Sequence, residues 1–128
     1  RQTLKTIPAG GKYAGAITLS YSGCSNNGTA SYWAELVLAQ AANGVMQFNW
    51  QAYDANGNPF TFVMGGASIQ QGQLYRVPAA TYAFGGTTLT ADVSEIRVTS
   101  QGIEGVWFSN FGNGCIENGF FSTLFLSP

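Results

Sequence analysis

The strongest constraint on the fold of this chain is the alternation of apolar and polar side chains along most of its length. Successive side chains of an extended strand point to opposite faces, so a period of two is typical of a strand with one buried face. Residues 45–53 show this period clearly, with apolar side chains that include Trp50. In residues 13–21 one face carries Tyr13, Gly15, Ile17, Leu19 and Tyr21. We therefore expect half-buried strands in both segments, with Trp50 in the core.

Glycine-rich turns interrupt the pattern at intervals of about 8–12 residues, which is typical of β-sandwiches and barrels. The Asn56-Gly57 pair supplies the positive φ angles of a tight hairpin. The pattern predicts one all-β domain over residues 1–128 with about eight to ten short strands. A single antiparallel barrel is expected ahead of a two-sheet sandwich. Short strands are expected at residues 74–77, 88–93 and 95–99, and a final pair at 106–110 and 120–126 is joined by a turn at 112–119.

Residues 31–43 are compatible with two structures. Their alanine- and leucine-rich composition favours a helix that ends at Gly44. The side chains of Tyr32, Ala34, Leu36 and Leu38 also alternate, and the neighbouring segments are strands. We predict a strand here, with a helix as the alternative.

The charge content excludes several classes of partner. Charged residues make up only 9% of the chain, and five of its residues are Lys or Arg. Five basic residues are too few for the phosphate contacts of a nucleic-acid-binding protein. No apolar run approaches the roughly 20 residues of a membrane-spanning helix. Solubility must come from neutral polar residues, which suits contacts with neutral partners such as glycans or other proteins.

Two cysteines, Cys24 and Cys115, lie far apart in glycine- and asparagine-rich surroundings. The chain has no His and no Cys-x-x-Cys motif, so a metal or redox site is a weak alternative. We predict a structural disulfide, which is typical of secreted, periplasmic or surface-exposed proteins. A glycosylation-type triplet at Asn27 agrees with such a compartment.

Acidic residues give two candidate sites for chemistry. Asp54, Asn56 and Asn58 alternate like the oxygen ligands of a calcium loop, but Pro59 follows and a bidentate Glu is missing. We therefore expect Asp54 to cap the backbone of its own hairpin. Neither a metal site nor a cofactor is predicted.

The second candidate is a pair of carboxylates. Glu104 and Glu117 bracket the last hairpin and could approach each other as in a glycosidase. Because both adjoin turns or strand ends, we expect them to be solvated charges, and no catalytic residue is predicted. An enzyme of this fold would need a deep pocket inside the barrel that holds a carboxylate or a tyrosine.

One run of residues resembles a β-rich module of secreted bacterial proteins. It comprises the turn at 42–44 and the aromatic strand and Tyr-Asp-Ala-Asn-Gly-Asn-Pro hairpin at 48–59. Gly105-Val106-Trp107, the turn at 113–115 and Gly119 are similar in placement to that module's closing hairpin. The resemblance implies an all-β fold and secretion, and it carries no activity with it.

The aromatic residues suggest a binding surface. Tyr53 shares a strand face with Gln47, Asn49 and Gln51, a combination of ring and amides that suits hydrogen bonding to a neutral glycan. Trp33 adjoins Tyr32, and adjacent strand residues cannot both face inward. The predicted ligand-binding residues are therefore Trp33, Gln47, Asn49, Gln51 and Tyr53. The alternative is an ordinary solvated sheet face.

These observations predict a secreted or surface recognition module without catalytic activity, whose ligand is a neutral carbohydrate ahead of a protein. The first alternative is a structural module of a larger surface or appendage assembly. It would self-associate through the final strand, residues 120–126, which is apolar on both faces. The second alternative is a small β-barrel hydrolase or cyclase.

Overall fold

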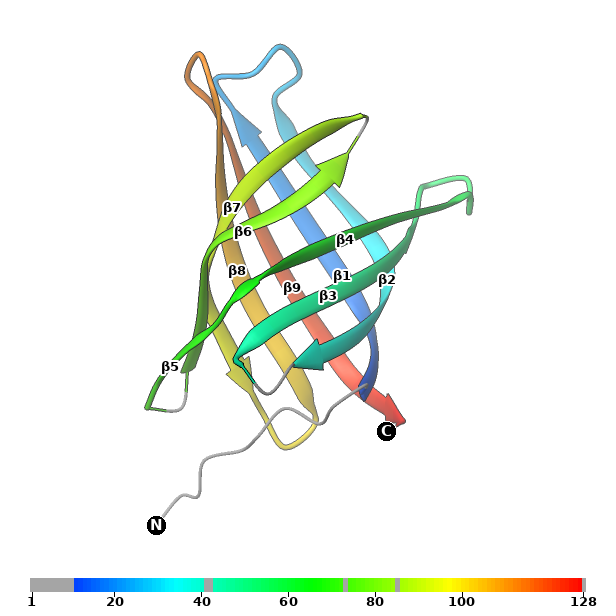
Figure 1. Ribbon diagram of the computed structural model, residues 1–128. Helices are drawn as coiled ribbons and strands as arrows, with labels where there is room; N and C mark the ends of the chain where they lie inside the picture. The colour runs from blue at the N-terminus through cyan, green and yellow to red at the C-terminus, as the bar shows by residue number, and fades with distance from the viewer. Residues whose placement is uncertain (1–10, 41–42, 73, 85, 128) are drawn as a thin grey trace.

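The computed structural model describes residues 11–40, 43–72, 74–84 and 86–127, and these residues form strands and turns without a helix (Figure 1). The nine strands are β1 (Gly11–Ser22), β2 (Gly28–Gln40), β3 (Val45–Tyr53), β4 (Pro59–Ala67), β5 (Ile69–Gln71), β6 (Leu74–Phe84), β7 (Thr87–Val98), β8 (Gly102–Gly112) and β9 (Cys115–Ser127). The all-β prediction is therefore confirmed.

The strands form one antiparallel sheet that closes on itself. Their order is β4-β3-β2-β1-β9-β8-β7-β6-β5, and a further pairing of β4 with β6 joins the two sides. Met64 pairs with Tyr82 and Gly65 with Thr81 at this closure. The result is an eight-stranded barrel with β5 as an extra strand on β6, which agrees with the expected barrel.

The ambiguous segment at residues 31–43 contributes a strand. Over residues 28–40, β2 pairs with β1 on one side and β3 on the other. This register places Ala34, Leu36 and Leu38 in the core, completely shielded from solvent. Pairing on both sides and burial of the alternating face outweigh the helical propensity of the composition. Residues 41 and 42 lie outside the described part of the chain.

Several strand boundaries were predicted wrongly. The segment expected at 74–77 extends over all of β6, and those at 88–93 and 95–99 form the single strand β7 with a shift of register between Val93 and Glu95. A bulge reverses the alternation without ending a strand, so the sequence pattern suggested two short strands. The turn expected at 112–119 is confined to Asn113 and Gly114, both with positive φ, because β9 begins at Cys115.

The barrel interior is packed with apolar and aromatic side chains. Trp50 is buried as predicted, and its ring lies 5.2 Å from that of Phe121. Two glycines make room for large rings on the neighbouring strand: Gly105 pairs with Phe121, and Gly119 pairs with Trp107. A Cβ atom added at either glycine would overlap the opposite ring.

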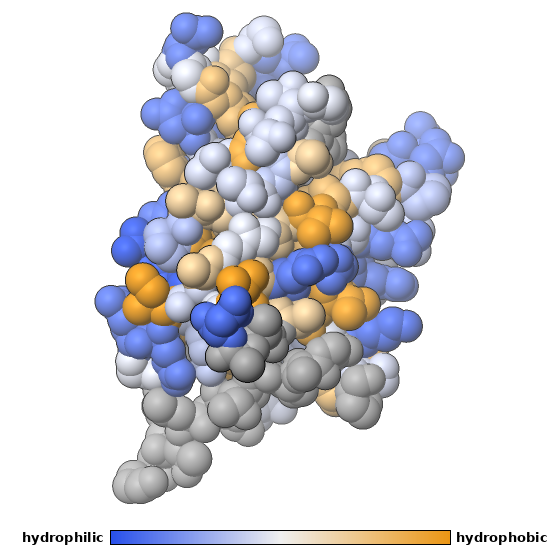
Figure 2. Space-filling view, in the orientation of Figure 1, coloured by the Kyte–Doolittle hydropathy of each residue, from blue (hydrophilic) through white to orange (hydrophobic). Residues whose placement is uncertain are grey.

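The outer surface is mixed in character. On the face shown in Figure 2, apolar side chains occur as separate spots among polar ones. Only some of the apolar side chains of β9 face inward. Phe121 is buried, whereas Phe120, Leu124 and Leu126 are exposed by 45%, 60% and 59%. The outward residues are those that the assembly alternative would use, and self-association stays a prediction.

The predicted disulfide between Cys24 and Cys115 is present. It joins the β1–β2 connection to the start of β9, at the upper end of the barrel in Figure 1. No helix that could span a membrane occurs among the described residues.

Candidate functional site

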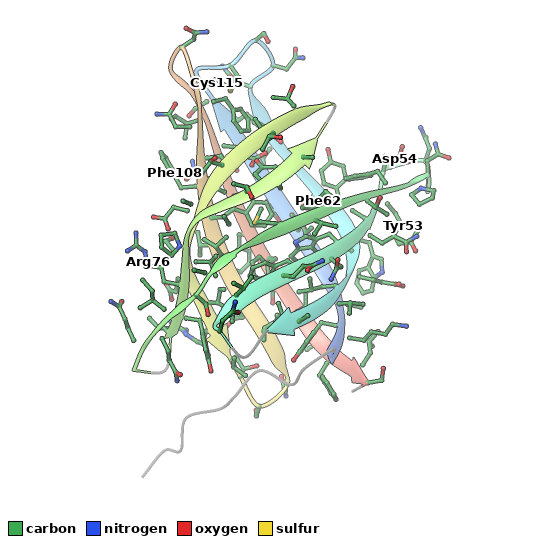
Figure 3. All side chains as sticks on the ribbon, viewed as in Figure 1. Tyr53, Asp54, Phe62, Arg76, Phe108 and Cys115 are labelled. Carbon is green, nitrogen blue, oxygen red and sulfur yellow. A yellow bond between two sulfur atoms is a disulfide. The ribbon has the colours of Figure 1, made fainter. Side chains whose placement is uncertain are left out.

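A cavity of about 280 Å³ opens inside the barrel at the end that carries the disulfide. Side chains from every barrel strand except β3 line it, so it is the interior of the barrel and not a surface groove. Its lining is mainly aromatic and aliphatic: Leu19, Tyr21, Tyr32, Phe60, Phe62, Tyr82, Leu89, Trp107, Phe111 and Glu117. In Figure 3, Phe62 lies in the middle of the barrel.

Glu117 is the acidic residue of this cavity, and it is 5% exposed. Its Oε1 atom accepts hydrogen bonds from the Trp107 indole Nε1 at 2.9 Å and from the Tyr82 hydroxyl at 3.0 Å. Its Oε2 atom accepts one from the Tyr21 hydroxyl at 2.7 Å. The Tyr82 hydroxyl also lies 3.3 Å from the buried Ser109 hydroxyl. Three neutral donors therefore hold one carboxyl group in a fixed position.

The register of β9 explains why this carboxyl group points inward. Glu117, Gly119 and Phe121 share one face of the strand, and all three are buried. Glu117 pairs with Tyr21 of β1 and with Ser109 of β8. The missing side chain at Gly119 leaves space for the Trp107 ring, whose nitrogen then reaches the carboxylate.

The two tyrosines are held in their protonated form. Burial raises the pKa of Tyr82 well above its usual value, and the charge of Glu117 adds to this, while the hydrogen bond with Ser109 acts in the opposite direction. Burial raises the pKa of Tyr21 in the same way, and its hydrogen bond to Glu117 reinforces the shift. At neutral pH both phenols are thus hydrogen-bond donors to the carboxylate.

The remaining wall is built from rings in mutual contact. Tyr32 meets Phe60 edge to face at a centroid distance of 5.5 Å, and Phe60 stacks on Phe62 at 6.5 Å. Phe62 in turn contacts Tyr82 at 6.4 Å. These contacts form a continuous aromatic wall from the barrel rim to the carboxylate.

The prediction that Glu117 is a solvated charge is wrong. Its position beside a turn suggested exposure, but β9 starts at Cys115, five residues earlier than the expected start at residue 120, so Glu117 is already part of the alternating face. Glu117 and Phe121 lie an even number of positions apart, which places their side chains on the same face of a strand. This spacing was the signal that could have placed Glu117 inside the barrel. Glu104 lies on the outward face of β8 and pairs with Ser122, so it does not form a carboxylate pair with Glu117, which was the alternative to two solvated charges.

The five predicted ligand-binding residues lie together on the outside of the barrel. Trp33 of β2 pairs with Tyr53 of β3, and Trp33 is 56% exposed. Gln47, Asn49 and Gln51 continue along the same face of β3. We call these five residues the outer strip. Figure 3 shows Tyr53 at the outer side of the barrel, away from Phe62.

Part of the outer strip lines a groove of about 510 Å³, together with residues of β1, β2, β4 and β9. Asn49 and Gln51 contribute to this groove, with Glu35 and Thr61 nearby. Some of the amides are already engaged, since Gln47 donates to Asn49 and Asn49 donates to the carbonyl oxygen of Val37. The outer strip and the barrel cavity are therefore two separate surfaces.

Asp54 acts as predicted. Its Oδ1 atom accepts hydrogen bonds from the backbone NH groups of Asn56 and Asn58, at 2.9 and 2.8 Å. Within the described ranges, no three His, Cys, Asp or Glu side chains gather in a way that could hold a metal ion.

No family model and no curated protein matches the sequence, and no solved structure matches the fold closely enough to count as similar.

Proposed function

We propose that this protein binds a small, mainly apolar molecule in the cavity at the open end of its barrel. The observation that carries the proposal is the combination of an aromatic wall with one fixed carboxyl group inside a cavity of about 280 Å³. Small-molecule sites are typically concave and apolar, with a few well-placed polar groups that orient the ligand. This proposal keeps the expected role in recognition, and it moves the ligand from the outer strip to the barrel interior.

A fluorescent probe tests the proposal. N-Phenyl-1-naphthylamine is neutral, and its emission rises in apolar surroundings. We expect saturable binding by the native protein and its loss in Leu89→Trp, because the larger ring would fill the cavity. Leu124→Trp is the matched control, since Leu124 lies exposed on the outer surface. Equal binding by all three proteins, or by none, would refute the cavity as the binding site.

A carboxylate and two tyrosines in a deep pocket also meet the condition expected of an enzyme of this fold. The fate of the bound molecule separates the two functions. Under the proposed function, mass spectrometry recovers every bound compound unchanged after prolonged incubation. Conversion that depends on Glu117 would instead establish catalysis.

The outer strip supports a second candidate, the recognition of a neutral glycan. The observation that favours it is the exposed ring of Trp33 directly beside Tyr53, since aromatic rings stack on sugar faces. A glycan array run with the native protein, Trp33→Ala and Tyr53→Ala tests this candidate. Binding that either substitution weakens supports it, and the absence of any bound glycan refutes it.

The compartment also remains a proposal. A disulfide is typical of oxidising compartments, so we infer that the protein works outside the cytoplasm. Detection of the protein and its oxidised cysteines in the secreted or periplasmic fraction of its cells would test this.

A further inference from the structure

The hydrogen bonds of Glu117 leave room for one more donor. A carboxylate has two oxygens with about four acceptor positions in total. Tyr82 and Trp107 occupy both positions of Oε1, whereas Tyr21 occupies one position of Oε2. One acceptor position of a residue that lines the cavity is therefore available to a ligand.

The three groups that hold Glu117 are all neutral. Among the described residues, the ion pairs are Arg76 with Asp92 and Arg97 with Glu95, and neither involves the cavity. Lys12 lines the groove of about 510 Å³ beside the outer strip, and not the cavity. A buried carboxylate without a cation strongly favours a positively charged partner, because burial removes the water that would otherwise stabilise its charge.

The wall of the cavity has the composition that receives cations. The faces of Tyr, Phe and Trp rings carry a negative electrostatic potential and attract ammonium groups within about 6 Å. Tyr32, Phe60 and Phe62 form a connected set of such rings, and Tyr21, Tyr82 and Trp107 surround the carboxylate itself. An ammonium group placed beside Oε2 would meet aromatic rings as well as the charge of Glu117.

Resting on the proposed function, we propose that the polar group of the ligand is an organic ammonium ion. Its N–H donates to the available position on Glu117 Oε2, and its apolar part lies against Phe62, Leu19 and Leu89. Carboxylates and phosphates are repelled by Glu117. Free sugars are excluded because the cavity offers few polar atoms for their many hydroxyl groups.

Two probes of similar size and different charge test this proposal. At pH 7, 2-phenylethylammonium is a cation, and 2-phenylethanol is its neutral analogue with a hydrogen-bond donor at the same place. Titration calorimetry should show that the ammonium ion binds at least about ten-fold more tightly, since a charge-assisted hydrogen bond and the ring faces favour it. Equal affinities, or tighter binding of the alcohol, overturn the proposal.

Glu117→Gln keeps the shape of the side chain and removes its charge. The preference for the ammonium ion should disappear in this variant, and a preference that persists refutes the role of Glu117. Circular dichroism shows whether Glu117→Gln is folded. If this variant does not fold, Tyr32→Leu gives an independent test, because that substitution removes one ring of the wall without touching the carboxylate. That variant should weaken ammonium binding by about three-fold and leave the alcohol nearly unaffected.

The neutral probe N-phenyl-1-naphthylamine separates this proposal from the proposed function. If it binds in the cavity and 2-phenylethylammonium neither binds nor displaces it, the ammonium proposal fails and the binding cavity stands. If neither compound binds, both proposals fail.

Discussion

The packing of Trp107 over Gly119 makes a prediction whose magnitude follows from the structure. In Gly119→Ala, the new Cβ atom would overlap the indole ring of Trp107, so the ring must move. Overpacking of this kind costs about 1–3 kcal/mol. The displaced ring would also lose its hydrogen bond to Glu117, worth about 1.5–3 kcal/mol for a charged acceptor.

A smaller effect acts in the opposite direction. Alanine restricts the unfolded chain more than glycine does, which favours the variant by about 0.5–1 kcal/mol. We therefore expect Gly119→Ala to lower the free energy of unfolding by about 2–5 kcal/mol. Since Gly119 does not have a positive φ angle, backbone strain does not contribute.

Urea denaturation followed by far-ultraviolet circular dichroism measures this loss without relying on the fluorescence of Trp107. Gly65→Ala is the matched control, because Gly65 also lies within a strand without a positive φ, and its Cβ would meet only the carbonyl oxygen of Met46 at 3.3 Å. We expect the control to change stability by no more than about 1 kcal/mol. In a Trp107→Leu background, Gly119→Ala should lose most of its effect. Equal stability of Gly119→Ala and Gly65→Ala, or an unchanged effect without the indole, would refute this account of the packing.

Three further predictions concern the disulfide, the tyrosines and the outer strip. Replacing Cys24 and Cys115 together by Ser should lower the free energy of unfolding by about 4–5 kcal/mol in the chain-entropy model, because the bridge spans 91 residues; an unchanged urea midpoint would contradict it. Stability should also fall as the pH rises above 10. The pKa of Tyr82 and Tyr21 is raised in the folded state, so the unfolded chain loses phenolic protons at a pH where the folded protein still retains them. The slope is at most about 1.4 kcal/mol per pH unit for each phenol, and urea titrations between pH 9 and 11 should show it reduced in Tyr82→Phe. Trp33→Ala should change the free energy of unfolding by less than about 0.5 kcal/mol, because the ring is exposed. A larger loss of stability in thermal denaturation would contradict this and show that the ring is packed against its neighbours.

Local sequence patterns were sufficient to predict the all-β class and the inward faces of several strands. The alternation in residues 13–21 and 45–53 placed Tyr13, Ile17 and Trp50 in the core, where the structure has them. A period of two is a property of each strand alone, so it needs no knowledge of the partners. Closure of the sheet depends on Met64 meeting Tyr82, which are far apart in the sequence, and nothing in either segment specifies that pairing.

The candidate cavity could not be predicted because it is a property of the closed barrel. Its residues come from strands spread over the chain between Leu19 and Glu117, and each one fits an ordinary core position when taken alone. The disulfide was predictable because chemistry restricts a pair of cysteines to few alternatives. Glu117 was missed because one residue beside a turn resembles a solvated charge until the start of its strand is known.

The position of Glu117 and its three hydrogen-bond donors within the barrel supports the proposal that they serve binding. At the opposite end of the barrel, the interior is filled by Leu38, Met46 and Ile103, and the hydroxyl of Thr123 is satisfied by a backbone carbonyl of Ile103. A buried carboxylate is not needed for such packing, and replacing buried ionic groups by apolar ones is often neutral or stabilising. Glu117 lies instead at the end with the cavity. There the disulfide joins the connection that follows β1 to the start of β9, and these are the two strands that carry Tyr21 and Glu117. A covalent link at this end keeps the donor and the acceptor in place where the barrel opens to solvent, as a preorganised binding site requires.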